Sequence, residues 1–272
     1  MKKQLSLLSL ALILCVTTLF AQNRETRSVG SFTKVSFRTP GKLYIRQGSS
    51  QKVEIEGKKD IVSQIETEVE GSKLVIGKKG KWSDWSWGSD DQITVYITVT
   101  KLEGLNVAGS GDAIGETKFT TDNVELSVSG SGSLKIDVAA SGSMDANVSG
   151  SGNMDLKGSA KSLESDVSGS GGIDFTLAIT DNADFAISGS GKIEGSGSAK
   201  YVKTSVTGSG KILCRDLVTN RCDVRISGSG DVEINVTNEL DANITGSGTV
   251  TYKGNPSKVN SSATGSGKVS KF

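Results

Sequence analysis

The residues best suited to contact a ligand in this 272-residue chain are three tryptophans in one short segment. Trp82, Trp85 and Trp87 are all the tryptophans of the chain, and they lie in the polar, glycine-bounded segment 81–88. Exposed aromatic rings favour ligand contact because they combine a large, rigid surface with a polar edge. The segment is therefore a candidate binding loop. The alternative is that the rings fold back and cover an end or a side of the domain.

Two cysteines are candidates for a disulfide bond. Cys15 lies in the apolar amino-terminal segment, which leaves Cys214 and Cys222 in the remainder of the chain. Both occupy inward-facing positions of one repeat in the pattern described below. We therefore expect them to be either buried, unreactive thiols or the two halves of an internal bridge.

The composition excludes several kinds of chemistry. The chain contains no histidine, which removes Ser-His-Asp triads, histidine acid-base catalysis and nearly all zinc or iron sites. Its glycine-rich segments contain neither a phosphate-loop ending nor a strand-to-helix Gly-x-Gly-x-x-Gly motif, so nucleotide binding is unsupported. The segment 169–174 is similar to calcium-binding β-roll repeats, but other repeats replace or displace its acid. We expect no catalytic residue, no cofactor and no metal.

A repeat of about 20 residues organises the chain from residue 108 onward. The triplet Gly-Ser-Gly recurs at intervals of 18 to 21 residues, with its first glycine at positions 109, 130, 150, 169, 189, 208, 228, 246 and 265. Two residues before that glycine stand Val128, Val148, Val167, Ile187, Val206, Ile226, Ile244 and Ala263. Two residues after the second glycine stand Leu134, Met154, Ile173, Ile193, Ile212, Val232, Val250 and Val269. Apolar residues therefore keep the same phase as the glycines.

This alternation predicts β-strands with one buried and one solvent-facing side. The outward positions carry charges of both signs, which favours a solvated surface, and we expect no acid pair with neighbouring basic clamps there. The inward glycines of each triplet suit a bend that aims the serine outward. A second break is expected half a repeat later, at 157–159, 180–182, 219–220, 237–238 and 254–256. Each coil should thus be strand, Gly-Ser-Gly corner, strand and loop.

The coils are expected to stack into an all-β, single-stranded parallel β-helix, or β-solenoid. About five inward apolar side chains per coil, at about 2 kcal/mol each, supply about 10 kcal/mol. Ordering about 20 residues costs roughly 20 to 40 kcal/mol, so one coil cannot fold without its neighbours. An antiparallel meander or barrel would also show alternation and turns, but the in-phase identity of the repeats favours the solenoid.

Residues 22–107 lack the Gly-Ser-Gly phase but contain alternating segments. Strands are expected at 32–37, 43–46, 53–56, 74–76 and 93–99. A helical turn is expected over 60–65, with Asp60 as its cap. Since no disordered linker follows, we expect these residues to form irregular first coils of the solenoid or a cap on it, and 108–272 to form its regular part.

The first 21 residues have the order of a secretory signal peptide. Lys2 and Lys3 precede an apolar run that ends at Phe20, and cleavage is expected after Ala21. A membrane-spanning helix is the alternative, but the apolar run is short and contains serine and threonine. A lipid anchor on Cys15 is less favoured, because a leucine stands where lipoprotein signals need a small residue.

The exported chain should be nearly neutral. Removing residues 1–21 removes two lysines from 31 basic residues, which leaves 29 against 30 acidic residues and a net charge near −1. This balance argues against nucleic acid, whose phosphates demand a basic face. No later segment is apolar and long enough to cross a bilayer as a helix. We expect the protein in the periplasm, at the cell surface or outside the cell.

The segment 101–112, KLEGLNVAGSGD, followed by repeated Val-Ser-Gly-Ser-Gly, resembles the head GIN-domain family of autotransporter-adhesin-like proteins. The similarity spans roughly residues 31–270 and implies a right-handed parallel β-helix. The family is common among envelope proteins of Bacteroidetes and is a domain of unknown function. It provides no catalytic or binding residues to transfer.

These observations favour an exported, non-catalytic, adhesin-like module of the cell envelope. Its expected partner is a glycan or an envelope protein, contacted through the solenoid face and through Trp82, Trp85 and Trp87. The alternative is a polysaccharide-active lyase or hydrolase, because some parallel β-helices cleave acidic polysaccharides with Asp, Lys or Arg on an outer face.

Overall fold

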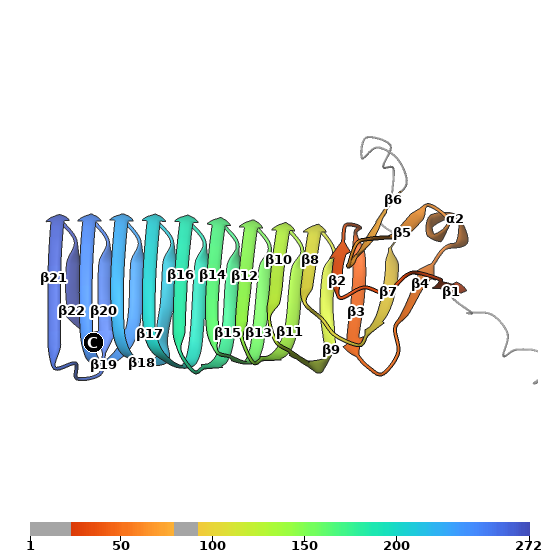
Figure 1. The fold of residues 1–272 in the computed structure, drawn as a ribbon. Helices are drawn as coiled ribbons and strands as arrows, with labels where there is room; N and C mark the ends of the chain where they lie inside the picture. Colours follow the sequence, from red (N-terminus) through yellow and green to blue (C-terminus); the bar gives the residue numbers. More distant parts are fainter. Residues whose placement is uncertain (1–22, 79–91) are drawn as a thin grey trace, which may run out of the picture.

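The computed structural model describes residues 23–78 and 92–272, which form an all-β parallel solenoid (Figure 1). Each regular coil supplies one strand that ends at the first glycine of a Gly-Ser-Gly triplet and one strand that begins after the triplet. We call the two resulting stacks the pre-corner sheet and the post-corner sheet. Strands of neighbouring coils run parallel within each stack, as the repeat predicts.

The regular strands alternate between the two sheets. The pre-corner sheet contains β8 (Gly104–Gly109), β10 (Val124–Gly130), β12 (Ser143–Gly150), β14 (Ser162–Gly169), β16 (Asn182–Gly189) and β21 (Lys258–Gly265). The post-corner sheet contains β9 (Asp112–Thr121), β11 (Ser133–Ala140), β13 (Asn153–Ala160), β15 (Gly172–Ile179), β20 (Thr249–Lys253) and β22 (Lys268–Lys271). Three long strands belong to both sheets: β17 (Lys192–Gly208), β18 (Lys211–Gly228) and β19 (Asp231–Gly246).

Like residues stacked in register build the core. In the pre-corner sheet Val128 lies opposite Val148, which lies opposite Val167. In the post-corner sheet Met154 lies opposite Ile173. All five side chains are buried. Because each layer covers the apolar side chains of the next, apolar burial and ladder hydrogen bonds stabilise the coils together.

The corner between the sheets requires glycine. The first glycine of each triplet has a positive φ, from +88° at Gly109 to +128° at Gly228. A Cβ added to Gly130 would lie 2.5 Å from the carbonyl oxygen of Gly109 in the preceding corner. The Ser131 amide donates to that same oxygen at 2.8 Å. Glycine is therefore needed both for its backbone conformation and for the close approach of successive corners.

The second bend of the coil differs from the expected loop. The breaks predicted at 180–182 and 254–256 are confirmed, since they separate β15 from β16 and β20 from β21. The breaks predicted at 219–220 and 237–238 are wrong, because β18 and β19 continue through them. The break predicted at 157–159 lies inside β13, where Gly158 has a φ of +119°. Left-handed glycines and register shifts can bend a strand without ending it.

Antiparallel strands close the amino-terminal end of the solenoid. The coil of β2 (Lys34–Phe37) and β3 (Gly41–Gln47) lies between β8 and β9 on one side and β6 (Lys73–Lys78) and β7 (Ile93–Val99) on the other. Outside these, β5 (Ile65–Glu70) pairs with β6, and β4 (Lys52–Gly57) pairs with β7 and with β1 (Asn23–Arg27), all antiparallel. These strands, at the right of Figure 1, cover an edge that would otherwise expose a parallel ladder.

One short helix, α2 (Lys59–Val62), belongs to this cap within the described ranges. The helical turn expected over 60–65 therefore begins earlier and is shorter. The prediction that Asp60 caps it is wrong: Lys58 holds the N-cap position without a side-chain bond, and the Asp60 carbonyl accepts from Ser63 Oγ. In residues 23–78 and 92–272 we find no helix with the length and apolar character needed to cross a membrane.

Candidate functional site

A hollow of about 740 Å³ opens on the outer face of the post-corner sheet, where β13, β15, β17, β18 and β19 lie side by side. We call it the bulge groove. Charged side chains form its rim and apolar atoms lie at its base. The residues that define it are Asp155, Asp174, Phe175, Thr176, Lys192, Glu194, Gly195, Ser196, Leu213, Arg215, Asp216 and Glu233.

Two register shifts create the bulge groove. Between β17 and β18 the pairing steps from Glu194 opposite Leu213 to Ser196 opposite Asp216, so β18 contains one extra residue. Between β18 and β19 the residues 215–217 have no partner in the ladder. A bulge bends the strand and re-aims its side chains. Arg215 and Asp216 are accordingly exposed at the rim of the groove.

A glycine and a phenylalanine shape the floor. Gly195 occupies the inward position at which neighbouring coils place an apolar side chain. A Cβ there would lie 2.1 Å from Cζ of Phe175, so this ring fills the space that the missing side chain leaves. Phe175 is buried and its ring packs 5.4 Å from that of Phe185. The floor is therefore apolar and tightly packed.

One ammonium group joins two carboxylates at the rim. Asp174 and Glu194 lie directly opposite each other on β15 and β17. Lys192 Nζ donates to Glu194 Oε2 at 2.8 Å and lies 3.6 Å from Asp174 Oδ1. The hydrogen bond to Glu194 raises the pKa of Lys192, so the ammonium group stays charged. The expectation that no acid pair with a basic clamp lies on the outer face is therefore wrong.

A second cation lies at the opposite side of the groove. Arg215 Nη2 donates to Glu233 Oε2 at 3.0 Å, and its guanidinium carbon lies 3.9 Å from the ring centroid of Phe272. A guanidinium group stacked on an aromatic ring and bound to a carboxylate keeps a fixed direction. Arg215 thus offers oriented donors to a molecule in the groove.

The bulge groove presents donors and acceptors together. Carboxylates accept, Lys192 and Arg215 donate, and the hydroxyl groups of Thr176 and Ser196 do both, with Ser196 Oγ donating to Thr176 Oγ1 at 3.2 Å. This combination matches a polyhydroxylated ligand, whose own hydroxyl groups also donate and accept. The exposed rim suits an extended ligand that lies along the face of the rod.

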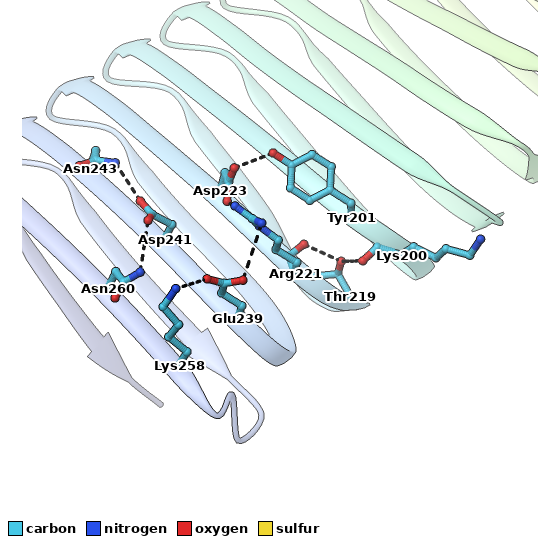
Figure 2. Close-up of polar contacts among 10 residues, drawn as sticks. All are labelled: Lys200, Tyr201, Thr219, Arg221, Asp223, Glu239, Asp241, Asn243, Lys258 and Asn260. Carbon is cyan, nitrogen blue, oxygen red and sulfur yellow. Dashed lines mark hydrogen bonds and ion pairs between the residues drawn. The ribbon is translucent and has the colours of Figure 1, made fainter.

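The pre-corner sheet carries a different polar surface near the carboxy-terminal end (Figure 2). Tyr201 Oη donates to Asp223 Oδ2 at 2.6 Å, and Arg221 lies 3.3 Å from Asp223 and 3.7 Å from Glu239. Lys258 Nζ donates to Glu239 Oε1 at 2.6 Å. This chain of contacts crosses four coils, so we call it the four-coil network.

The four-coil network satisfies its own groups. Burial, followed by the bond to Asp223, raises the pKa of Tyr201 to about 12, so the phenol remains a donor at neutral pH. The Lys258 hydrogen bond lowers the pKa of Glu239, which keeps that carboxylate charged. Beside it, Asp241 accepts from Asn243 at 2.9 Å (Figure 2). We interpret these contacts as a lateral brace between coils.

A row of four acids also faces outward on the pre-corner sheet. Its members lie directly opposite one another on β10, β12, β14 and β16: Glu125, Asp145, Glu164 and Asp184. Lys34 lies 3.1 Å from the acid at one end and Lys203 lies 3.0 Å from the acid at the other. Burial, and then the neighbouring acids, raise the pKa of the two central carboxyl groups. Like charges in register cost stability.

The structure describes the two predicted cysteines but not the three predicted tryptophans. Trp82, Trp85 and Trp87 lie outside the described residues, as does the predicted signal peptide 1–21. Cys214 and Cys222 are both free and buried, and burial raises the pKa of both thiols. Within 23–78 and 92–272 no group of three or more acids and cysteines is arranged to hold a metal ion.

The repeat alone did not reveal the bulge groove. Its acids occupy ordinary outward positions, and coil lengths of 18 to 21 residues hide the extra residues of β18. The sequence feature that could have indicated the groove is Gly195. It stands four residues after the Gly-Ser-Gly corner, at the position where the preceding coil has Phe175 and the following coil has Cys214. A glycine inside a strand pattern often marks a bulge or a close backbone approach.

Comparison with known proteins finds a matching family and solved structures of the same fold. The family model described as "Putative auto-transporter adhesin, head GIN domain" matches residues 31–194 and 173–256. A "putative lipid binding protein" from Parabacteroides distasonis is 27% identical with a TM-score of 0.69, over 93% of this chain and 98% of that one.

Two other solved structures show the same fold. A "putative adhesin" from Parabacteroides distasonis is 22% identical with a TM-score of 0.71, over 92% of this chain and 96% of that one. A "putative adhesin" from Parabacteroides merdae is 20% identical with a TM-score of 0.65, over 92% of this chain and 95% of that one. No curated protein matches the chain.

Proposed function

The chain belongs to the head GIN-domain family, and we propose that it is a non-catalytic, adhesin-like module of the cell envelope that binds a glycan in the bulge groove. The family description and the names of similar structures support a binding role. The observation that carries the choice of site is the groove itself, where two oriented cations and a row of carboxylates surround an apolar floor.

The lining of the bulge groove favours a glycan over an acyl chain. One similar structure is named a lipid-binding protein, and an acyl chain would need a deep apolar cavity. The bulge groove is instead lined mainly by charged and hydroxyl side chains. The apolar side chains between the two sheets pack against one another in one continuous core from the amino-terminal cap to Val250.

The proton chemistry of the bulge groove favours binding over catalysis. A lyase needs a base near neutral pH, whereas the hydrogen bond that Lys192 donates to Glu194 raises the pKa of Lys192 and keeps it protonated. Asp174 and Glu194 both contact this one ammonium group, an arrangement suited to charge pairing and to accepting hydroxyl hydrogens. The polysaccharide-active enzyme is the competing function, and a direct assay separates the two.

Glycan binding is tested with residues 22–272, the mature chain expected after cleavage at Ala21, on an array of bacterial and host glycans, followed by calorimetry with the best binder. Removing a carboxylate in Asp174→Ala or Glu194→Ala should weaken binding about tenfold, the value of one charge-assisted hydrogen bond. The control is Asp241→Ala, which removes an acid from the surface shown in Figure 2 and should leave affinity unchanged. Equal affinity for all four proteins would place the ligand elsewhere.

Catalysis is tested by incubating the same protein with a panel of acidic and neutral polysaccharides. We expect neither reducing ends nor unsaturated ends to accumulate. Release of either product by the unmodified chain, abolished by Asp174→Ala, would replace the binding function by the enzymatic one.

Export is tested at the amino terminus. We expect the protein recovered from the producing cells to begin at Gln22, after removal of residues 1–21. Cell fractionation should recover this form with the envelope or the medium. A chain that retains Met1 and stays with the cytoplasm would contradict the proposed location.

A further inference from the structure

A second hollow, of about 350 Å³, lies on the opposite sheet near the amino-terminal cap. It opens over β6, β2, β8 and β10. At its centre Gly104 stands between Lys34 and Glu125 in the ladder, where other coils place an outward side chain. The missing side chain makes the hollow, and we call it the Gly104 hollow.

A directed chain of hydrogen bonds forms the floor of the Gly104 hollow. Arg38 Nε donates to Ser36 Oγ at 3.0 Å, and Ser36 Oγ donates to Asn106 Oδ1 at 3.2 Å. Asn106 Nδ2 then donates to Ser127 Oγ at 2.6 Å. Successive bonds of this kind polarise one another. Since Ser127 accepts at the end of the chain, its own O–H is left to donate into the hollow.

Three cations surround this floor. Lys34 and Lys73 lie directly opposite each other on β2 and β6, and Arg38 stands at the exposed end of the hydrogen-bond chain. The lining contains one carboxylate, that of Glu125. Like charges placed opposite each other cost stability, so Lys34 and Lys73 would gain from an anion between them.

The single carboxylate occupies part of the site. Lys34 Nζ lies 3.1 Å from Glu125 Oε2, and its Cγ and Cδ lie 3.2 Å from the position that a Cβ on Gly104 would take. The Lys34 side chain therefore lies across the glycine to reach Glu125. Both side chains of this pair are substantially exposed, 40% and 60%, so the ion pair can open at little cost.

We propose that the Gly104 hollow binds an oxyanion, a carboxylate or sulfate group carried by a ligand of the protein. Arg38 and Ser127 donate hydrogen bonds to the anion, Lys34 and Lys73 supply the charge, and the anion displaces Glu125 from Lys34. This site is separate from the bulge groove, which lies on the other sheet, and does not depend on it.

The test uses three small probes that share one sugar ring: glucuronate, glucose 6-sulfate and glucose. Binding is followed by amide chemical shifts of Gly104 and Ser127 in the full mature chain. We expect both anions to shift these amides and to bind about tenfold more tightly than glucose. A response to only one anion identifies the group recognised, carboxylate or sulfate.

Four variants separate this site from a general attraction of anions. Arg38→Ala and Ser127→Ala should weaken anion binding about tenfold, and the second changes no charge. Glu125→Gln should strengthen it several-fold, because it removes the competing carboxylate. Lys157→Ala makes a matched loss of charge on the other sheet and should leave affinity unchanged.

Thermal unfolding of each variant confirms that the fold is intact before its affinity is compared. Equal shifts with glucose and glucuronate would overturn the proposal. So would an unchanged affinity in both Arg38→Ala and Ser127→Ala, or a loss in Glu125→Gln.

Discussion

Gly195 and Phe175 show how a single residue shapes the bulge groove. The Phe175 ring occupies the space where a side chain at 195 would lie, with a Cβ-to-Cζ separation of 2.1 Å. We therefore predict that Gly195→Ala lowers the free energy of unfolding by about 1 to 3 kcal/mol, the range for overpacking a core. Chemical denaturation of the mature chain measures this loss.

The matched control is Gly77→Ala. Among residues 23–78 and 92–272, a Cβ at Gly77 meets nothing within 4 Å, and the φ of Gly77 is not positive, so this variant should unfold at the same denaturant concentration as the unmodified chain. Phe175→Leu combined with Gly195→Ala should recover part of the loss, because the shorter side chain leaves room. Identical midpoints for Gly195→Ala and Gly77→Ala would disprove the packing account.

The two cysteines should behave as core residues. Both are fully buried and free, and burial raises the pKa of each thiol, which disfavours the reactive thiolate. We predict that a thiol reagent modifies neither Cys214 nor Cys222 in the native chain and modifies both after unfolding. Denatured chain without reactive thiols would contradict this prediction, because it would show an internal bridge between the two cysteines.

The four acids in register on the pre-corner sheet, Glu125, Asp145, Glu164 and Asp184, should make stability depend on pH. Burial, followed by Asp166, Asp145 and Asp184, raises the pKa of Glu164. A carboxyl group with a raised pKa binds its proton more tightly in the folded state. Its contribution to stability is therefore present below the ordinary pKa of about 4 and is lost as the pH rises through the folded-state pKa.

Replacing this acid should accordingly stabilise the protein at neutral pH. We predict that Glu164→Gln raises the free energy of unfolding by about 0.5 kcal/mol at pH 7, and that the gain disappears below about pH 4. Glu239→Gln is the opposite control, because the Lys258 hydrogen bond lowers the pKa of Glu239. It should destabilise at pH 7. Equal effects of both variants at pH 7 would contradict the electrostatic explanation.

Some elements were predictable from the sequence and others were not, for physical reasons. The Gly-Ser-Gly period predicted the coils and the parallel stacking because each coil needs glycine at its corner. Gly130, for example, has a positive φ and leaves no room for a Cβ. Strand direction in residues 22–107 was not predictable, because alternation is the same in parallel and antiparallel strands. The strand β4 was therefore predicted without its antiparallel direction. The cap strands β1 and β5 were not predicted at all, and β1 (NRETR) has no apolar residue that could alternate.

The candidate sites were harder to predict than the coils. A groove that depends on a register shift in β18 requires knowledge of which residues face each other across neighbouring strands. The Gly104 hollow likewise requires the pairing of β2, β6 and β8, which are far apart in the sequence. A resemblance to a family of unknown function could not supply either site.

At the scale of the whole molecule, the two ends of the rod are closed differently. Antiparallel strands and α2 cover the amino-terminal end, whereas every residue of β21 is exposed. The last coil places Lys258, Lys268 and Lys271 on or beside its open edges. Lysines on an edge strand discourage pairing with another chain. The carboxy-terminal coil therefore stabilises the rod less than the inner coils do.

This difference can be measured with one pair of substitutions. Val148 and Val259 are both strand valines of the pre-corner sheet, but Val148 is buried whereas Val259 is 40% exposed. We predict that Val148→Ala costs about 2 kcal/mol of unfolding free energy and Val259→Ala less than about 0.5 kcal/mol. Similar losses at both positions would mean that the last coil is as well packed as the centre.

The most direct test of the central claim is a map of ligand contact on the solenoid. The amide spectrum of the isotope-labelled mature chain is recorded with and without the best-binding glycan from the array. We predict shifts confined to the bulge groove, at residues such as Glu194, Ser196 and Leu213, and a glycan recovered uncleaved. Shifts confined to the pre-corner sheet, or a cleaved glycan, would contradict it.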